Sequence, residues 1–363
     1  MTTPVEPSPA PAEPPTGGRP PAERGWWRLL LALAAFLLVP ALPQFRAVLP
    51  VEHTMVLVVP ALAACCLVGW WAGGRLLLAA IWVGLAVLVA VQTPAAPSVY
   101  HNLARGWSLL LAGAFGLVCL FGARRPFFPR ALTSLTVAFG LAFAMSAFGP
   151  MTGAQVREAL GAEFGRRNAE TVTTMRQILT NYSGPWRRFV SRVPRAADAP
   201  AEIERQLGAL SNAGVEVFPA LLALESLGAL AFAWAAYHRL GRTRLGSPLG
   251  PLKDFRFNDQ LVWGLIVGLT IVFLPTLAGL RTAGSNLLVF FGALYALRGL
   301  GVLAWFLAPG ALAGGLTVGL AMLLWPVLNV IAVLGFMILL IAALGLGLGD
   351  TWADWRRRPR PTT

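Results

Sequence analysis

The most constraining feature of this sequence is a series of apolar runs, each long enough to cross a lipid bilayer. A transmembrane helix needs about 20 predominantly apolar residues, and residues 214–237 exceed that length. Only 12% of the chain is charged and 56% is hydrophobic, whereas soluble domains carry about 25% charged residues. The sequence therefore predicts an all-α protein, a polytopic transmembrane helix bundle.

The number of spans depends on the last apolar region, residues 311–347. As a single helix this region would be about 55 Å long, against a hydrocarbon core of about 30 Å. Pro326 and Asn329 interrupt it, which favours two spans and a total of ten, with one kinked span and a total of nine as the alternative. The other predicted spans lie at 26–43, 55–72, 75–93, 106–122, 131–149, 214–237, 260–280 and 285–307.

Composition divides the chain into five parts. We expect a disordered, Pro-rich cytoplasmic tail at 1–25, five spans within 26–149, amphipathic helices at 150–213, four or five spans within 214–349, and a basic cytoplasmic tail at 350–363.

Arginines indicate the orientation. They gather in the links on the same side as the N-terminus, and the positive-inside rule then places the N-terminus in the cytoplasm. Arginine used in place of lysine, with abundant Ala, Gly and Pro, is typical of a GC-rich bacterial genome. We therefore predict a multi-pass protein of the bacterial inner membrane. The arginines that support this orientation are Arg75, Arg124, Arg125 and Arg130.

The segment 150–213 is the one long polar insertion. Apolar residues recur in it at a helical period between Arg and Glu, which predicts two or three amphipathic helices on the outer side. Trp186 lies beside Arg187 and Arg188 in one apolar stripe. These helices would lie on the membrane surface, pack on their own bundle or bind a membrane or periplasmic protein partner.

The closing stretch of the chain has a similar interfacial character. Trp352 and Trp355 suit the aromatic belt of a membrane interface, and Arg356 suits contact with anionic lipid heads.

Two opposite charges are predicted at membrane depth. A carboxylate there costs at least about 2.5 kcal/mol on insertion scales, so it normally faces the protein interior and has a partner. Glu225 and Arg298 are the strongest such charges, and we expect them to pair. The pair would be a structural ion pair or, alternatively, part of a substrate or ion site.

Asn286 and Asn329 are further candidates for a ligand site. Asn329 follows Pro326, where helical hydrogen bonds are already missing. Broken helices of this kind line binding sites in transporters, and they also occur as plain kinks.

The sequence offers little for chemistry. Cys65, Cys66 and Cys119 lie inside apolar runs without metal-ligand spacing, and the three histidines lack a second ligand at helical spacing. Hydrolase triads, Walker loops and dinucleotide-binding turns are absent from the sequence, so we predict neither an enzyme nor a cofactor. The placement of arginines at span ends also argues against nucleic acid as a partner.

Short motifs in the C-terminal half carry a resemblance to a known family. They are Phe255-Arg256-Phe257, Asn286-Leu287-Leu288, Arg298-Gly299-Leu300-Gly301-Val302, and Leu344-Gly345-Leu346-Gly347-Leu348-Gly349-Asp350 with Trp355-Arg356. Over about residues 214–358 the chain resembles the YybS-like family of predicted bacterial membrane proteins, which has no established function.

That family is grouped distantly with the substrate-binding S components of energy-coupling-factor vitamin transporters. The resemblance implies a helical bundle with a small-molecule pocket that opens outward. The chain departs from S components in its larger size. It also lacks their Ala-x-x-x-Ala face on the first helix, where Ala32 meets Phe36 and Ala35 meets Val39.

These observations give two functional hypotheses. The first is a transporter-like or small-molecule-binding membrane protein with a pocket bounded by Glu225, Arg298, Asn286 and Asn329. The alternative is a membrane scaffold that uses the 150–213 helices to hold a partner. A polar cavity around Glu225 would favour binding, and a large exposed apolar patch on the insertion would favour a partner.

Overall fold

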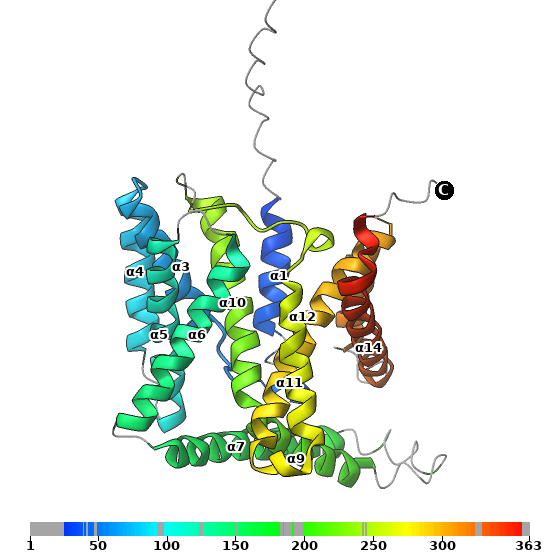
Figure 1. Ribbon diagram of the computed structural model, residues 1–363. Coiled ribbons are helices and arrows are strands. Elements are labelled where there is room, and N and C mark those ends of the chain that lie inside the picture. The colour runs from blue at the N-terminus through cyan, green and yellow to red at the C-terminus, as the bar shows by residue number, and fades with distance from the viewer. Residues whose placement is uncertain are drawn as a thin grey trace, which may run out of the picture.

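In the computed structural model, every regular element of the described residues is a helix (Figure 1). The structure describes residues 25–38, 40, 43–46, 49–92, 98–122, 126–149, 152–181, 184, 191, 199–241, 243, 245–308, 310–323 and 329–357. The α-helices are α1 (Trp26–Leu38), α2 (Pro43–Arg46), α3 (Met55–Trp71), α4 (Leu76–Val91), α5 (Val99–Phe121), α6 (Phe127–Phe148), α7 (Gly153–Asn181), α9 (Ala199–Glu216), α10 (Phe218–Leu240), α11 (Val262–Phe273), α12 (Arg281–Phe306), α13 (Ala311–Leu323) and α14 (Asn329–Ala353).

Within the described part of the chain, ten of the helical segments are strongly apolar. Five are long enough to cross a membrane, namely α5, α6, α10, the segment Pro275–Phe306 that contains α12, and Ala332–Ala353 of α14. The other five are shorter and contain α1, α3, α4, α11 and α13. The predicted helical membrane bundle is thus confirmed. The region 311–347 forms two helices, α13 and α14, as the two-span alternative requires.

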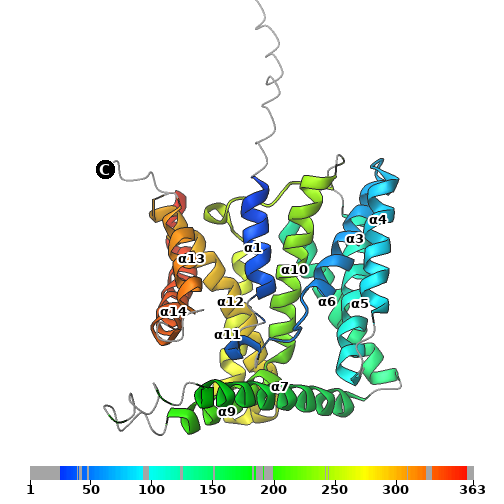
Figure 2. The same cartoon turned by 180° about the vertical axis from the view of Figure 1, so that it is seen from behind.

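The helices run between two ends of one bundle. α1 begins and α14 ends at the same end, while α7 and α9 lie across the other end, roughly perpendicular to the rest (Figures 1 and 2). We call these the α1 end and the α7 end. α7 lies within the predicted insertion 150–213 and α9 extends three residues beyond it, to Glu216, whereas Trp186, Arg187 and Arg188 lie outside the described residues.

α10 occupies the middle of the bundle. It packs against α3 and α6 on one side and against α12 on the other, with α1 beside it. Pro219 lies in its first turn, where a missing N–H costs nothing. Trp234 is fully buried and packs on Phe115 and Phe127, with ring centroids 6.1 and 5.9 Å away. α10, which contains most of the apolar run 214–237, is therefore the central helix of the fold, while the first residues of that run end α9.

α12 and α14 approach each other through glycine. A Cβ atom at Gly299 would overlap the carbonyl oxygen of Ala343, and one at Gly347 would overlap that of Tyr295. Small residues permit such close contact between helices in membranes, where packing and not the hydrophobic effect holds helices together. Close backbone packing thus explains Gly299 and Gly347 of the C-terminal motifs, whereas a Cβ at Gly345 would meet no atom within 4 Å.

Candidate ligand site at the α7 end of the bundle

Arg167 fastens α7 to the bundle. Its side chain is only 1% exposed, and its Nε donates a hydrogen bond to Glu163 on the same helix at 2.9 Å. Its terminal nitrogens donate to the backbone carbonyls of Leu49 at 2.8 Å and Pro50 at 3.4 Å. The guanidinium also lies over the Tyr100 ring, 5.1 Å from the centroid. Arg167 therefore holds residues 49–51, which we call the strap, against α7.

Glu225 on α10 also holds the strap. Its Oε2 accepts a hydrogen bond from the Val51 backbone N–H at 2.9 Å, and the side chain is 5% exposed. Its Oε1 has no hydrogen-bond partner among the described residues. The Tyr100 hydroxyl donates to the Pro50 carbonyl, so α5 fixes the same strap. Three helices, α5, α7 and α10, thus meet at three consecutive backbone residues.

Carboxylates and arginines form a network of ion pairs next to the strap. Glu52 pairs with Arg46, and Arg166 lies 3.8 Å from it. Glu163 accepts from Arg166 at 2.6 Å and from Arg167 at 2.9 Å. Burial alone would raise the pKa of Glu52 and Glu163. The hydrogen bonds from Arg46 to the former and from Arg166 and Arg167 to the latter outweigh it, so the pKa of each lies below its ordinary value. Both groups therefore remain ionised at neutral pH.

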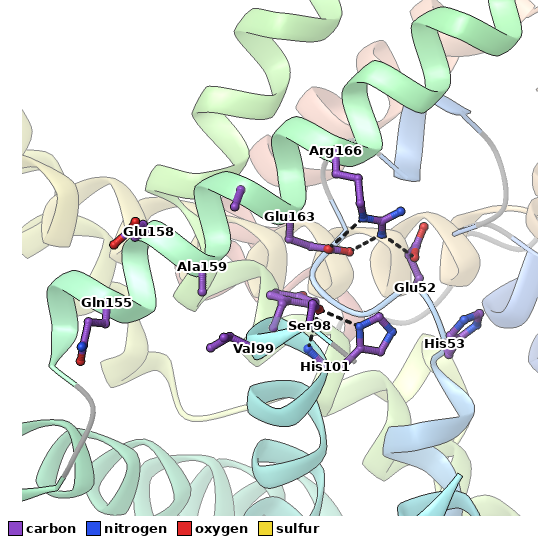
Figure 3. A pocket seen from close by; sticks show the side chains of 12 residues that line it. Glu52, His53, Ser98, Val99, His101, Gln155, Glu158, Ala159, Glu163 and Arg166 are labelled. Atoms are coloured by element: carbon purple, nitrogen blue, oxygen red, sulfur yellow. Dashed lines mark hydrogen bonds and ion pairs between the residues drawn. The ribbon is translucent and has the colours of Figure 1, made fainter. Parts of the chain in front are cut away.

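These side chains border an open cleft of about 1070 Å³ between α7 and the start of α5, which we call the α7 cleft. Figure 3 shows Glu163 and Arg166 facing Glu52, with His53 and His101 on the opposite wall. Ser98 fixes His101 by a hydrogen bond of 2.8 Å to its ring nitrogen. The cleft is lined by Glu52, His53, Ser98, Val99, Tyr100, His101, Gln155, Glu158, Ala159, Ala162, Glu163 and Arg166.

The cleft can hold a polar ligand in an environment of both charge signs. Its walls come from the 50–54 segment, α5 and α7, so that a ligand would touch three segments distant in sequence. Among the described residues, no three His, Cys, Asp or Glu side chains come close enough to hold a metal ion. The arrangement suits recognition by hydrogen bonds and charge.

Residues 30–347 match the model of a family described as Predicted membrane protein (DUF2232). The chain belongs to this family. The matched region extends from α1 into α14 and contains the strap and every wall of the α7 cleft. No curated protein and no solved structure matches the chain.

The expected pair of Glu225 and Arg298 is wrong. Arg298 donates to Asp350 at 2.9 Å and to Asp259 at 2.5 Å, and Arg356 pairs with Asp350 at 2.6 Å. The physical reason is that the two residues lie at different positions along the axis of the bundle. Arg298 lies in the last third of α12, close to the α1 end, where α14 finishes and α11 starts, whereas Glu225 contacts the strap at the α7 end.

The other sequence-based candidates also lie apart, so they do not bound one pocket in this DUF2232 member. Asn286 donates to the Glu216 carbonyl at 2.8 Å and accepts from the Ala220 N–H at 2.9 Å, so it joins α12 to the junction of α9 and α10. The side chain of Asn329 lies outside the described residues. Glu225 lines none of the clefts described for this chain.

At the α1 end, the three residues predicted to lie at the membrane interface differ in exposure. Trp352 is 73% exposed. Trp355 is half-buried beside Gly349, and the Arg356 guanidinium is engaged with Asp350 and with the carbonyls of Lys253 and Phe255. Arg356 thus has a structural role, joining the end of α14 to residues 253–255. The helix α14 also continues to Ala353, into the stretch expected to begin the basic tail.

Sequence reasoning missed the charged cluster on α7, although a signal was present. Glu163 and Arg167 stand four residues apart, and each is three residues after an apolar residue of the buried stripe, Leu160 and Phe164. Residues three and four apart share a helix face. Two opposite charges on the apolar face of an amphipathic helix predict a buried ion pair turned toward the bundle.

Proposed function

We propose that this DUF2232 member is a transporter-like membrane protein that binds a small molecule at the α7 end of the bundle. The observation that carries the proposal is the α7 cleft, whose walls bring fixed charges of both signs together with two histidines. Specific ligand sites are concave and place a few polar groups from several elements around the ligand. The role we propose is binding and passage, without catalysis.

The proposal includes an orientation. Arg75 lies in the short link between α3 and α4, and Arg239 lies in the last turn of α10, both at the α1 end. By the positive-inside rule, the α1 end with the N-terminus would be cytoplasmic, and the α7 cleft would open outward from a bacterial inner membrane. This fits the outward-facing pocket that the resemblance to YybS-like proteins and S components implies.

A thermal-shift screen of the purified, full-length protein tests the proposal. The panel would contain vitamins, amino acids, nucleotides and lipids. A ligand present at 100 times its Kd stabilises the folded state by about 2.7 kcal/mol. Glu158→Gln and His53→Asn alter exposed residues of the cleft, and Arg157→Gln is a matched control on the outer face of α7.

We expect at least one ligand to stabilise the wild type and the Arg157→Gln control strongly, and the two cleft variants less. Ligands that stabilise all four proteins equally would place binding elsewhere and refute the site. A panel without any hit would count against a binding function.

The competing function is a membrane scaffold that holds a partner through the 150–213 helices. In the described part of this insertion, Leu160 and Phe164 face the bundle, and Leu210 is the only exposed large hydrophobic side chain. A docking surface for a protein partner usually needs a contiguous apolar patch. The described part of the insertion therefore offers no apolar patch that would favour the scaffold over ligand binding.

A further inference from the structure

A second polar cleft adjoins the α7 cleft. It has a volume of about 500 Å³ and lies where α3 and α5 begin and α4 ends. Glu52, His53, Tyr100 and His101 belong to the walls of both clefts, and Arg105 belongs to this one alone. We call it the Arg105 cleft.

An apolar groove of about 560 Å³ lies on the same three helices, and we call it the lateral groove. Its floor contains small residues such as Ala63, Ala112 and Gly113. Its rim is open to the surroundings, since Val87 is 55% exposed and Leu117 is 52% exposed. In a bilayer this opening faces hydrocarbon.

The Arg105 cleft and the lateral groove follow one another along all three helices. On α3 the cleft includes Val56 and the groove includes Pro60, four residues later. On α5 the corresponding residues are Arg105 and Leu109. On α4, whose chain direction is opposite, Ala86 in the groove precedes Val89 in the cleft by three residues. Residues three or four apart are neighbours on one helix face, so the polar cleft leads directly into the apolar groove.

The length of this path suits one hydrocarbon chain. From Pro60 to Val68, the groove residues of α3 rise about 12 Å at 1.5 Å per residue. One leaflet of a hydrocarbon core about 30 Å thick is about 15 Å deep. The lateral groove therefore covers most of the depth that a lipid chain occupies when its head lies at the α7 end.

The charge at the polar end favours an anion. Arg105 is half-buried, and among the described residues no carboxylate forms an ion pair with it, whereas Glu52 is already paired with Arg46. α3 and α5 both begin at this end, so their positive dipole ends add to the potential. His53 and His101 supply further donors.

We propose that the ligand of this site is an anionic amphiphile, a phosphate-bearing lipid whose head occupies the Arg105 cleft and whose single chain occupies the lateral groove. This inference rests on the proposed function and specifies its substrate class. The head would contact Arg105 and extend toward the α7 cleft, while the chain would enter from the bilayer through the open rim.

Two substitutions test the binding of the lipid head and the binding of the lipid chain separately. A Cβ at Gly113 meets no atom within 4 Å, and Gly113 lines the groove, so Gly113→Leu places a bulky apolar side chain there with no clash at its Cβ. Gly140 on α6 is equally unobstructed and exposed, and Gly140→Leu is its matched control. Arg105→Gln removes the free guanidinium, with Arg157→Gln as the control.

The experiment measures binding of palmitoyl lysophosphatidylglycerol to the full-length protein by native mass spectrometry and by thermal shift. Monopalmitoylglycerol, which has the same chain and no phosphate, and glycerol phosphate, which has no chain, are the two comparison probes. We expect Arg105→Gln, which removes charged hydrogen-bond donors from the head site, and Gly113→Leu, which fills the chain site, each to raise the Kd for the lysolipid at least about tenfold. The controls should leave the Kd unchanged, and both comparison probes should bind far more weakly.

Equal lysolipid binding by Gly113→Leu and Gly140→Leu would overturn the inference, as would glycerol phosphate binding as tightly as the lysolipid. If polar ligands still depend on Glu158 and His53 in that case, the proposed function stands and only the amphiphile is wrong. If no ligand depends on any of the cleft or groove variants, both proposals fail.

Discussion

Arg167 offers the sharpest test of how α7 is held to the bundle. The change Arg167→Met keeps a long apolar stem in a site that is almost fully buried and removes the guanidinium. It thereby removes the hydrogen bonds to Glu163 and to the carbonyls of Leu49 and Pro50. The question is how much of the folding free energy depends on this one side chain.

The expected loss of folding free energy depends on which buried groups lose their hydrogen-bond partner in Arg167→Met. Breaking a buried ion pair costs about 3–5 kcal/mol when the partner charge stays buried. Glu163 keeps two bonds from Arg166, at 2.6 and 3.1 Å, which favours the low end of that range. The loss of a bond to the Leu49 carbonyl adds about 1 kcal/mol, while the Pro50 carbonyl keeps its bond from Tyr100. The expected cost is therefore about 4 kcal/mol.

The assay is equilibrium unfolding in mixed micelles, followed by circular dichroism. Arg157→Met is the matched control, because Arg157 lies on the same helix and is exposed. A surface substitution of this kind should change the free energy of unfolding by no more than about 0.5 kcal/mol. The double variant Arg167→Met with Glu163→Gln should cost less than the sum of the single variants, since it removes the stranded charge.

A cost below about 1 kcal/mol for Arg167→Met would refute the reasoning, because it would mean that water or another group solvates Glu163 once the guanidinium is gone. Additivity of the two substitutions would equally show that Glu163 and Arg167 do not depend on each other.

Two further predictions concern stability at low pH and the glycine contact between α12 and α14. The pKa values of Glu52 and Glu163 lie below 4.5 in the folded state, so their stabilising contribution is present above about pH 4.5 and is lost as the pH falls through the folded values. The Tm should therefore fall on acidification below about pH 4.5, and Glu163→Gln should show a smaller fall; parallel pH profiles of variant and wild type would contradict this. Gly347→Ala should disrupt the contact of α12 with α14 and lower the Tm by several degrees, because its Cβ would meet the Tyr295 backbone, whereas Gly345→Ala meets no atom within 4 Å. Equal Tm values for these two variants would show that the helices can separate at little cost.

The fold could be predicted from the sequence because the bilayer limits the choices. A long apolar run must become a helix in which every backbone hydrogen bond is made internally. The length of 311–347 then required a break, and the chain forms α13 and α14 there. The short length of helices such as α1 and α11 was less predictable, because α1 ends at Leu38 and α11 at Phe273, each before the end of the apolar run from which the span was predicted.

The candidate site was harder to predict from the sequence than the fold, because residue types do not reveal which groups form hydrogen bonds with its charged side chains. Glu225 needed compensation, as its depth implied, but the group that supplies it is the backbone N–H of Val51, which any residue other than proline would offer. Arg298 likewise pairs with carboxylates, those of Asp350 and Asp259, which nothing in the sequence connected to it.

A buried charge therefore predicts that a partner exists and says little about which one, because several groups at the right height can satisfy it. The more informative signal was on α7, where an acid and an arginine four residues apart interrupt an apolar stripe. An ion pair on the apolar face of such a helix is buried when that face packs on the bundle. Because α7 crosses the end of the bundle, its buried pair contacts the backbone that lies at that end. In this chain that is the strap, whose carbonyls accept from Arg167 while its one free N–H is taken by Glu225. Arg167, which Glu163 holds on α7, and Glu225 on α10 thus bind the same three backbone residues, and the proposed ligand site lies where the strap ends.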